Sequence, residues 1–338
     1  MTMTIAAGPD RDVFGDGAGD HSTLQRYHTL NASFDDPFVF DLTDRGLYSE
    51  VNNLLNAIAF GLITRRRLLV RTASIQGVAW AGLFDTDLPA FSPAVPVDPE
   101  WIVANVNSPH FRTIRTTGTQ MWERGERVDV EALGLAGMDI FALRRRLAGM
   151  FCVRRIDAGF WRAALRLPGI HCTDAAQMRR MRLRPGAFAA LHVRRGDKIE
   201  GDPGHTDAAG NVVIEGEATP MAVCLELILA AAPTTDTLFV LTDDYAAIRE
   251  LRALAPRLRL VTLCPRTSTG YRNRDFLQRP LAARTAALRR VLAEVQIAAQ
   301  SALFAGPYKS NLARYVANIH RDPARCVSVD ALRKWTPL

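Results

Sequence analysis

The chain has 338 residues, which is long for one ordinary hydrophobic core and enough for two α/β domains of roughly 100–200 residues each. Apolar residues make up 48% and charged residues 23% of it, a balance that excludes a disordered or fibrous protein. The formal net charge of +7 is compatible with a phosphate-bearing ligand, nucleic acid or an acidic surface, although a genomic preference for arginine explains most of the basic residues more simply.

The sequence lacks the patterns of a zinc site, a disulfide framework and an exported protein. Its five cysteines lie far apart, without CxxC or Cys/His ligand spacing. Residues 1–20 contain no charged segment followed by an apolar one, and no run of about 18 apolar residues occurs. We therefore expect a cytoplasmic protein with no signal peptide, no metal site and no stable membrane anchor.

The first half of the chain predicts a flexible segment followed by an α/β domain over 31–182. Residues 1–30 are rich in Gly, Asp and Ser and are expected to be a mobile lead-in. The elements predicted next are a strand over 38–42, a helix over 49–60, a basic stop at 65–67 and a strand over 68–71. These form a βαβ unit with parallel strands. Loops are expected over 84–135, and helical patterns resume at 140–151 and near 160–167.

The second half, after a linker near 181–186, predicts a C-terminal Rossmann-like domain over 183–338. Strands are expected over 187–193, 238–242, 258–263, 302–305 and 326–329. Helices are expected over 221–232, 246–254, 281–301 and 311–319. Such alternation predicts a doubly wound sheet that binds ligands at the carboxyl ends of its strands.

A basic cluster, His192-Val193-Arg194-Arg195-Gly196-Asp197-Lys198, follows the first of these strands. Alternation places His192 and Arg194 on one face and Arg195 on the other, before Gly196 opens a tight loop. An arginine here can hold a diphosphate bidentately and stabilise its charge as a bond to a sugar breaks. The alternative is a structural ion pair between Arg195 and Asp197. We favour the functional interpretation because the cluster lies at the ligand-binding edge of the sheet.

Two aspartates, Asp243 and Asp244, directly follow the strand predicted over 238–242. Paired carboxylates can bind a divalent metal, act as acid and base, or cap the next helix. The helix cap is the favoured interpretation from the sequence.

A third polar group, Gly306-Pro307-Tyr308-Lys309-Ser310-Asn311, precedes the helix predicted over 311–319. A helix N-terminus offers free N–H groups and a positive dipole end that suit phosphate, and Ser310 can add a hydroxyl. The alternative is ordinary N-capping by Ser310 or Asn311. The glycine spacing is not that of a Walker loop.

A carboxylate, Glu294, lies among apolar residues of the long predicted helix. Guanine recognition requires a carboxylate that accepts from two adjacent N–H groups, and Glu294 can supply it if its helix face meets the ligand site. A solvent-facing glutamate is the usual alternative.

These groups, in this order, resemble the α1,6-fucosyltransferases, with the protein O-fucosyltransferases as more distant relatives. The resemblance is strongest over 187–317 and rests on the stretches 192–198, 242–244 and 294–314; residues 49–54 also look like the family's opening helix. It implies two facing Rossmann-like domains of the GT-B type. It also implies an inverting enzyme that uses GDP-fucose without a metal.

The resemblance assigns donor contacts to five residues. Arg194 would hold the β-phosphate, Ser310 would contact phosphate, and Tyr308 would also contact the donor. His192 and Glu294 would lie near guanine. The family usually has aspartate at the position of Glu294.

The resemblance assigns supporting and catalytic roles to others. Arg195 and Lys198 would support the donor, and Asp243 and Asp244 would keep the strand end in its active arrangement. The animal core-fucosylation enzyme has a glutamate, proposed as the base, four residues after its motif lysine.

The catalytic base departs from that pattern here. The matching position is Asp202, with Glu200 nearby, and either carboxylate could take the proton of the acceptor hydroxyl. The animal enzyme's membrane anchor, coiled-coil stem and C-terminal module are missing, which favours a bacterial-type cytosolic enzyme.

The sequence thus predicts an inverting, metal-independent transferase that moves fucose from GDP-fucose to a glycan or oligosaccharide hydroxyl. No further cofactor and no nucleic-acid partner are expected, and the acceptor side is expected on residues 31–182. Two alternatives remain: a transferase with another nucleotide sugar, and a non-catalytic protein that binds a nucleotide or a polyanion.

Overall fold

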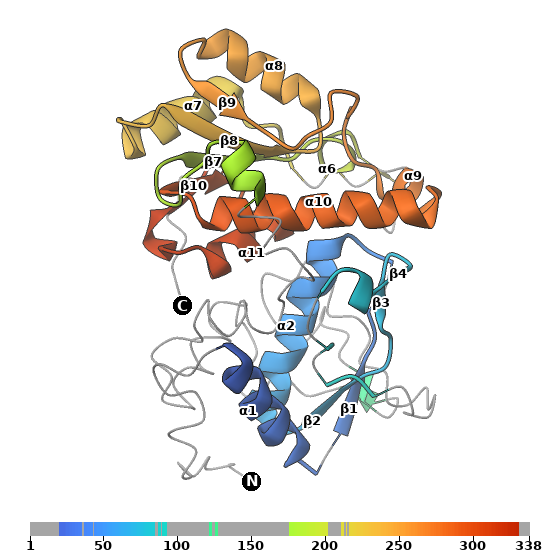
Figure 1. Ribbon diagram of the computed structural model, residues 1–338. Helices are drawn as coiled ribbons and strands as arrows, with labels where there is room; N and C mark the ends of the chain where they lie inside the picture. Colours follow the sequence, from blue (N-terminus) through green and yellow to red (C-terminus); the bar gives the residue numbers. More distant parts are fainter. Residues whose placement is uncertain are drawn as a thin grey trace. The chain divides into compact units, whose positions relative to one another are not determined.

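The computed structural model describes residues 20–92 except 36, 43, 85, 86 and 89, residues 122–123 and 126–127, and residues 176–330 except 202–210, 213 and 215. The helices predicted at 140–151 and near 160–167 lie outside the described residues. The chain divides into two compact units between residues 166 and 167 (Figure 1). Each unit contains parallel strands that are connected through helices.

A βαβ arrangement forms the centre of the first unit, as the sequence predicted. Its elements are β1 (Pro37–Phe40), α2 (Leu47–Thr64) and β2 (Arg67–Val70), with the two strands paired in parallel. Val51, Leu54 and Ile58 have the spacing of one helix face, and each is at most 1% exposed. The helix ends at Arg65, which adopts a left-handed conformation with a φ of 55°. The prediction that this helix ends at the basic residues 65–67 is therefore confirmed.

The predicted mobile lead-in is wrong for residues 20–30, because α1 (Asp20–Ala32) is a helix. Tyr27 is buried. Asn31 donates from Nδ2 to the Leu68 carbonyl at 2.9 Å and accepts at Oδ1 from the Leu68 N–H at 2.8 Å. The helix is mostly polar, so it shows little hydrophobic periodicity, and it is held to β2 by these few buried contacts.

Short antiparallel hairpins complete the described part of the first unit. They are β3 (Ser74–Ile75) with β4 (Val78–Ala79), and β5 (Trp122–Glu123) with β6 (Glu126–Arg127). The short helix η2 (Trp80–Gly82) follows β4, and the Trp80 ring stacks on Phe84 with 4.0 Å between the ring centroids. Most of the loop region predicted over 84–135 lies outside the described residues; β5 and β6 show that part of it is a hairpin.

A five-stranded, wholly parallel sheet forms the second unit, in the order β11-β10-β7-β8-β9. The strands are β7 (Ala189–Val193), β8 (Thr237–Thr242), β9 (Arg259–Val261), β10 (Leu303–Gly306) and β11 (Cys326–Ser328). Every residue of β7, β8 and β10 is buried, as is typical of parallel strands covered on both faces. The α/β class and the parallel sheet are confirmed.

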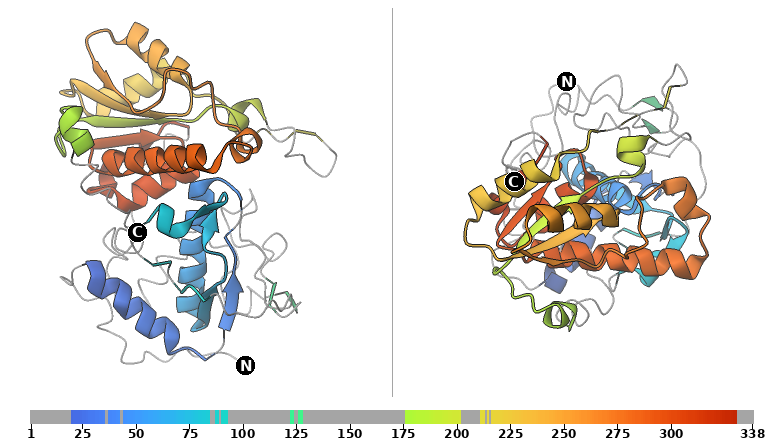
Figure 2. Two further views of the ribbon diagram at one scale, coloured as in Figure 1. Left: turned by 45° about the vertical axis from the view of Figure 1, so that its right-hand side comes forward. Right: turned by 90° about the horizontal axis from the view of Figure 1, so that it is seen from above.

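Helices cover both faces of this sheet (Figures 1 and 2). The longer ones are α7 (Met221–Ala231), α8 (Tyr245–Leu254), α10 (Leu281–Ala299) and α11 (Asn311–Ile319). The shorter ones are α6 (Asp197–Glu200), α9 (Asn273–Leu277) and η4 (Pro323–Arg325). On one face, α7 and α8 pack against Leu191 and Val240. On the other face lie α10 and α11, so alternate residues of each strand point to different helix pairs.

The strand order places a topological switch point between β7 and β10. From β7 the chain continues to β8 and β9 on one side, and it returns to the other side of β7 at β10. In open α/β sheets, ligands bind outside the carboxyl ends of the strands at such a point. The three polar groups of the sequence all follow carboxyl ends of strands, after β7, β8 and β10.

Candidate functional site

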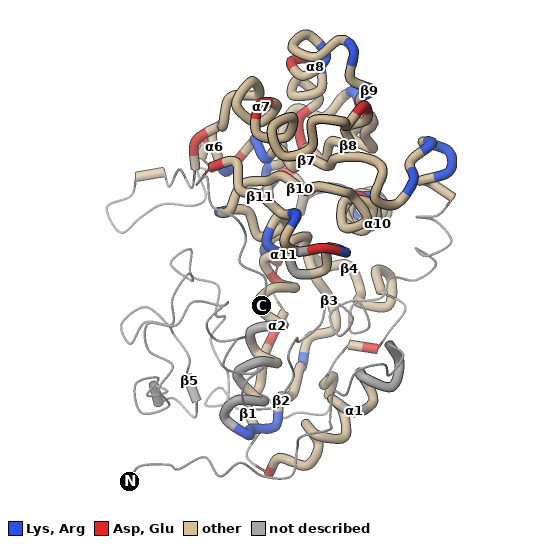
Figure 3. Tube along the Cα trace, turned by 90° about the vertical axis from the view of Figure 1, so that its left-hand side faces the viewer, with Lys and Arg blue, Asp and Glu red and all other residues tan. Residues whose placement is uncertain are grey.

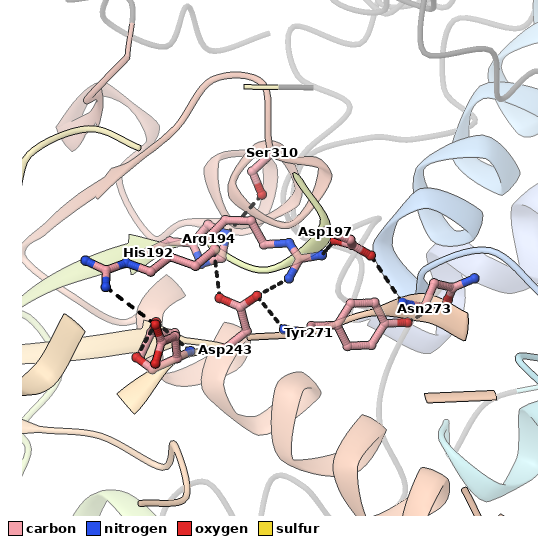
Figure 4. Close-up of polar contacts among 10 residues, drawn as sticks. His192, Arg194, Asp197, Asp243, Tyr271, Asn273 and Ser310 are labelled. Carbon is pink, nitrogen blue, oxygen red and sulfur yellow. Dashed lines mark hydrogen bonds and ion pairs between the residues drawn. The ribbon is translucent and has the colours of Figure 1, made fainter. Parts of the chain in front are cut away.

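Arg194, directly after β7, is enclosed on three sides (Figure 4). Its guanidinium forms ion pairs with Asp243 and, at 2.5 Å, with Asp197. The Tyr271 ring lies under it, with 4.9 Å between Arg194 Cζ and the ring centroid. The arginine side chain is 18% exposed, so part of it stays accessible to a ligand.

Asp243 connects three segments of this site. One carboxylate oxygen, Oδ1, accepts from the Arg195 N–H at 2.8 Å, and the other, Oδ2, accepts from the Tyr271 N–H at 3.0 Å as well as from Arg194. The Asp243 carbonyl accepts from the Gly270 N–H at 2.9 Å. The aspartate therefore fixes the end of β7 and the 270–273 loop to the end of β8.

Asp244 is the N-cap of α8, which confirms the favoured interpretation of the two aspartates. Its Oδ1 accepts from the Ala246 N–H at 2.8 Å. Its Oδ2 lies 3.4 Å from Nη1 of Arg195.

Arg195 points to the opposite side of the sheet from Arg194, as the strand alternation predicted. Its guanidinium contacts both carboxylate oxygens of Glu250 on α8, at 2.8 and 2.7 Å. This fork lowers the pKa of Glu250 and raises that of Arg195. The alternative ion pair between Arg195 and Asp197 is wrong, because the turn at Gly196 returns Asp197 to the side of Arg194.

His192 and Ser310 meet across the switch point. The His192 Nε2 lies 3.0 Å from the Ser310 Oγ, which joins the end of β7 to the start of α11. His192 is 4% exposed, and burial lowers its pKa to about 4, so the ring is neutral at pH 7. Ser310 also caps α11 by accepting from the Ala313 N–H at 3.4 Å, which confirms the N-cap interpretation.

The loop before α11 has an acidic partner that the sequence did not indicate. The backbone N–H groups of Tyr308 and Lys309 donate to the two carboxylate oxygens of Asp330, at 2.7 and 3.2 Å. Arg314 donates to the Tyr308 carbonyl at 2.9 Å and lies over the Tyr308 ring. These N–H groups, which could have bound phosphate, already bind a carboxylate, so Ser310 is the stronger candidate for a phosphate contact.

Glu294 is buried in α10, which packs against β7 and β8, so a solvent-facing glutamate is excluded. It is 4% exposed, and its Oε1 has no hydrogen-bond partner in the described part of the chain. Burial raises its pKa to about 8; Arg290 opposes this rise, and the charge of Asp243 adds to it. A buried acceptor without a partner is costly, and it marks a place where a ligand donor can bind.

Glu294 should make the protein less stable as the pH rises. Its carboxyl pKa is about 8 in the folded protein and about 4.3 in an unfolded chain. Between these values the folded state holds a proton that the unfolded state has lost. The free energy of unfolding should therefore fall by up to about 1.4 kcal/mol per pH unit from about pH 5 to 8.

Urea unfolding across that pH range measures this effect. Glu294→Gln should flatten the slope and make the protein more stable than the wild type at pH 8. Glu226→Gln, on the exposed face of α7, is the matched control and should leave the slope unchanged. If the free energy of unfolding falls with pH equally in Glu294→Gln and the wild type, the raised pKa of Glu294 is contradicted.

The remaining predicted residues lie around α6. Glu200 forms an ion pair with Arg272, and both side chains are about half exposed. Lys198 is half-buried, and its carbonyl accepts from the Gly216 N–H at 3.1 Å. Asp202, the other candidate base, lies outside the described residues. Figure 3 shows acidic and basic residues close together around α6 and β7.

The sequence interpretation missed the 270–273 loop. Asp197 accepts from the Asn273 N–H at 3.2 Å and donates from its own N–H to the Tyr271 carbonyl at 3.0 Å. Burial raises the pKa of Asp197, although Arg194 opposes the rise. The loop follows β9 at the same edge of the sheet. The Thr269-Gly270 pair at its start was the sequence signal that could have indicated a turn there.

The described residues form neither a metal site nor a membrane-spanning helix. No group of three His, Cys, Asp or Glu side chains lies close enough to hold a metal ion. No helix in the same ranges is long and apolar enough to cross a membrane.

The chain is similar in structure to fucosyltransferases. No protein-family model and no curated protein matches its sequence. NodZ alpha-1,6-fucosyltransferase soaked with GDP-fucose is 15% identical, with a TM-score of 0.45 over 84% of this chain and 93% of that one. A mutant of FUT1 from Arabidopsis thaliana in complex with GDP is 11% identical, with a TM-score of 0.49 over 93% and 74%. POFUT1 in complex with GDP-fucose is 12% identical, with a TM-score of 0.47 over 87% and 97%. Since none of these three proteins is more than 15% identical to the chain, the assignment of a function depends on the residues of the site described above.

Proposed function

We propose that this protein is a glycosyltransferase that moves fucose from GDP-fucose to a glycan hydroxyl, with inversion and without a metal. The observation that carries the proposal is the arrangement at the switch point. There the His192–Ser310 pair bridges β7 and α11, beside an arginine whose side chain is partly exposed. An arginine next to a histidine–serine pair at this edge suits a nucleoside diphosphate.

The donor is proposed to lie along this edge, with Arg194 on its β-phosphate. Arg194 uses two N–H groups for its carboxylate partners, and a guanidinium has five. Ser310 would contact the phosphate, and Tyr308 would also contact the donor. Lys198 would support the donor from α6, and Arg195 would do so indirectly, through its backbone N–H on Asp243.

The guanine is proposed to lie between His192 and Glu294. The N1–H and the amino group of guanine are adjacent donors, and the two oxygens of an ionised Glu294 can accept from both. Because the pKa of Glu294 is about 8 before ligand binding, GDP binding at pH 7 should release a proton. This proton release distinguishes recognition by Glu294 from binding through phosphate alone.

The proposed reaction is a single displacement. The acceptor oxygen attacks the anomeric carbon of fucose from the face opposite the diphosphate, and the bond from that carbon to the β-phosphate oxygen breaks. Arg194 stabilises the charge that develops on the departing GDP. The acceptor proton passes to a carboxylate, with Glu200 and Asp202 as the two candidates.

The N-terminal domain is proposed to supply the acceptor side, in a two-domain arrangement of the GT-B type with the domain boundary near residue 182. No further cofactor is proposed. The support for this arrangement is the motif resemblance together with the parallel βαβ arrangement of β1, α2 and β2.

A donor screen tests the proposal directly. The protein is incubated with a set of nucleotide sugars and oligosaccharides, and the released nucleoside diphosphate is measured with and without EDTA. We expect turnover with GDP-fucose that EDTA does not reduce, and NMR of the product should show the inverted anomer. Turnover with another nucleotide sugar alone would reassign the donor, and loss of activity with EDTA would contradict metal independence.

Calorimetry separates a transferase from a polyanion binder. GDP should bind with weak salt dependence and in preference to a nucleic-acid mixture. Steep salt dependence without preference for GDP would contradict the transferase assignment.

A further inference from the structure

Tyr271 belongs to a loop outside the sequence motifs of the site. The loop is fixed at both ends. The Tyr245 N–H donates to the Ser268 carbonyl at 2.9 Å, and Thr269 pairs with Asp244 in an antiparallel bridge. The Tyr271 ring packs against the buried Phe276 of α9, with 5.3 Å between the ring centroids. The loop is therefore held in place by the start of α8 and by Phe276 of α9.

The same loop binds both carboxylates that hold Arg194. The Tyr271 N–H donates to Asp243, and the Asn273 N–H donates to Asp197. The Tyr271 carbonyl accepts from the Asp197 N–H. Figure 4 shows Tyr271 between Asp243 and Asn273, with Arg194 and Asp197 beside them. A shift of this loop would therefore move both carboxylate partners of the arginine.

The Tyr271 ring supplies the third contact of the guanidinium. An aromatic ring attracts a guanidinium through its face. The carboxylates accept from two N–H groups, and Arg194 Cζ lies over the Tyr271 ring, which uses none of these groups. Together they leave the remaining N–H groups for a ligand and restrict the rotamers of the arginine. Such pre-organisation strengthens binding because less freedom is lost when the ligand arrives.

We propose that Tyr271 is a positioning residue for the nucleoside diphosphate, acting through Arg194, whose guanidinium it stacks against and orients. This inference rests on the proposed function, since it assigns the diphosphate to Arg194. Tyr271 itself need not touch the donor. The sugar acceptor should bind independently of Tyr271.

GDP affinity measured by calorimetry tests the proposal. Tyr271→Leu removes the aromatic face and should weaken GDP binding by about 3- to 30-fold. Tyr271→Phe keeps the face and loses the hydrogen bond from Oη to Asn273, so its affinity should stay within about twofold of the wild type. In turnover, Tyr271→Leu should raise the KM for GDP-fucose and leave the KM for the acceptor unchanged.

A double-mutant cycle shows whether Tyr271 acts through the arginine. In an Arg194→Ala background, Tyr271→Leu should weaken GDP binding no further. An equal loss in both backgrounds, or an equal loss in Tyr271→Phe and Tyr271→Leu, would overturn the proposal. Tyr245→Leu is the matched control, because the Tyr245 ring packs on the α7–α8 face, and it should leave GDP affinity unchanged.

A nucleotide-free measurement keeps this inference separate from the proposed function. The ring should shift the Arg194 Nε–H resonance and slow its exchange with water. Tyr271→Leu should remove both effects, and Tyr271→Phe should keep them. If the wild type binds no GDP, the proposed function fails, and this NMR result still decides whether Tyr271 orients Arg194. An unchanged Arg194 resonance in Tyr271→Leu would overturn the inference.

Discussion

Arg194→Ala should lower the rate of sugar transfer by a factor of about 100 to 1,000 while the protein stays folded. Removal of one group that stabilises developing charge typically costs this much. Asp243 keeps its bonds to the Arg195 and Tyr271 N–H groups, so the strand end should stay in place. Arg194→Lys retains a charge but loses the planar fork and the stacking on Tyr271, so it should restore only part of the rate.

Initial rates with GDP-fucose, together with circular dichroism and thermal unfolding, measure this effect. Some loss of thermal stability is expected, because Asp197 and Asp243 lose their cationic partner. Arg252→Ala, on the exposed surface of α8, is the control and should change neither rate nor fold. Turnover of Arg194→Ala within tenfold of the wild type would refute the role given to this arginine.

Gly196→Ala should destabilise the protein by about 3 kcal/mol or more and should also weaken GDP binding. Gly196 has a φ of 65° and a ψ of −137°, a conformation open essentially only to glycine and costly for other residues by about 1–3 kcal/mol. A Cβ atom there would lie 2.3 Å from the Tyr271 carbonyl oxygen and 2.6 Å from its nitrogen. The loop that holds Asp197 and Asp243 would have to move, and Arg194 would lose its contacts with these carboxylates and with the Tyr271 ring.

Gly216→Ala is the matched control for this substitution. A Cβ atom at Gly216 would meet nothing within 4 Å, so its stability should match the wild type to within about 0.5 kcal/mol. Urea unfolding and GDP calorimetry compare the two variants. Equal stability of Gly196→Ala and Gly216→Ala would show that the close approach of Tyr271 does not require a glycine at position 196.

The sheet of the second unit was predictable because its strands are continuous apolar runs. Residues 238–241 are buried on both faces, and such runs separated by helical patterns have few other structural solutions. The edge of the sheet was predictable for the same reason, since the carboxyl ends of parallel strands lie together. The meeting of His192 with Ser310 and of Arg194 with Asp243 follows from it.

The partners of each side chain were harder to predict, because they depend on tertiary contacts. Whether Asp197 forms its ion pair with Arg194 or with Arg195 depends on the turn at Gly196, and the spacing of the motif does not decide between them. Tyr271 reaches the site through a loop after β9 that carries no periodic pattern. The helix α1 was missed because its attachment depends on single buried residues, Tyr27 and Asn31, rather than on an apolar stripe.

The position of β7 between β8 and β10 has a consequence for the synthesis of the protein. On the ribosome, β8 emerges soon after β7, but β10 follows only after β9 and the long helix α10. Until then one edge of β7 has no strand to pair with, and exposed strand edges favour aggregation. The pairing of Ala189 with Leu303 and the contact of His192 with Ser310 form late and together. A nascent chain that ends before residue 310 can therefore carry the arginine motif but no complete donor site.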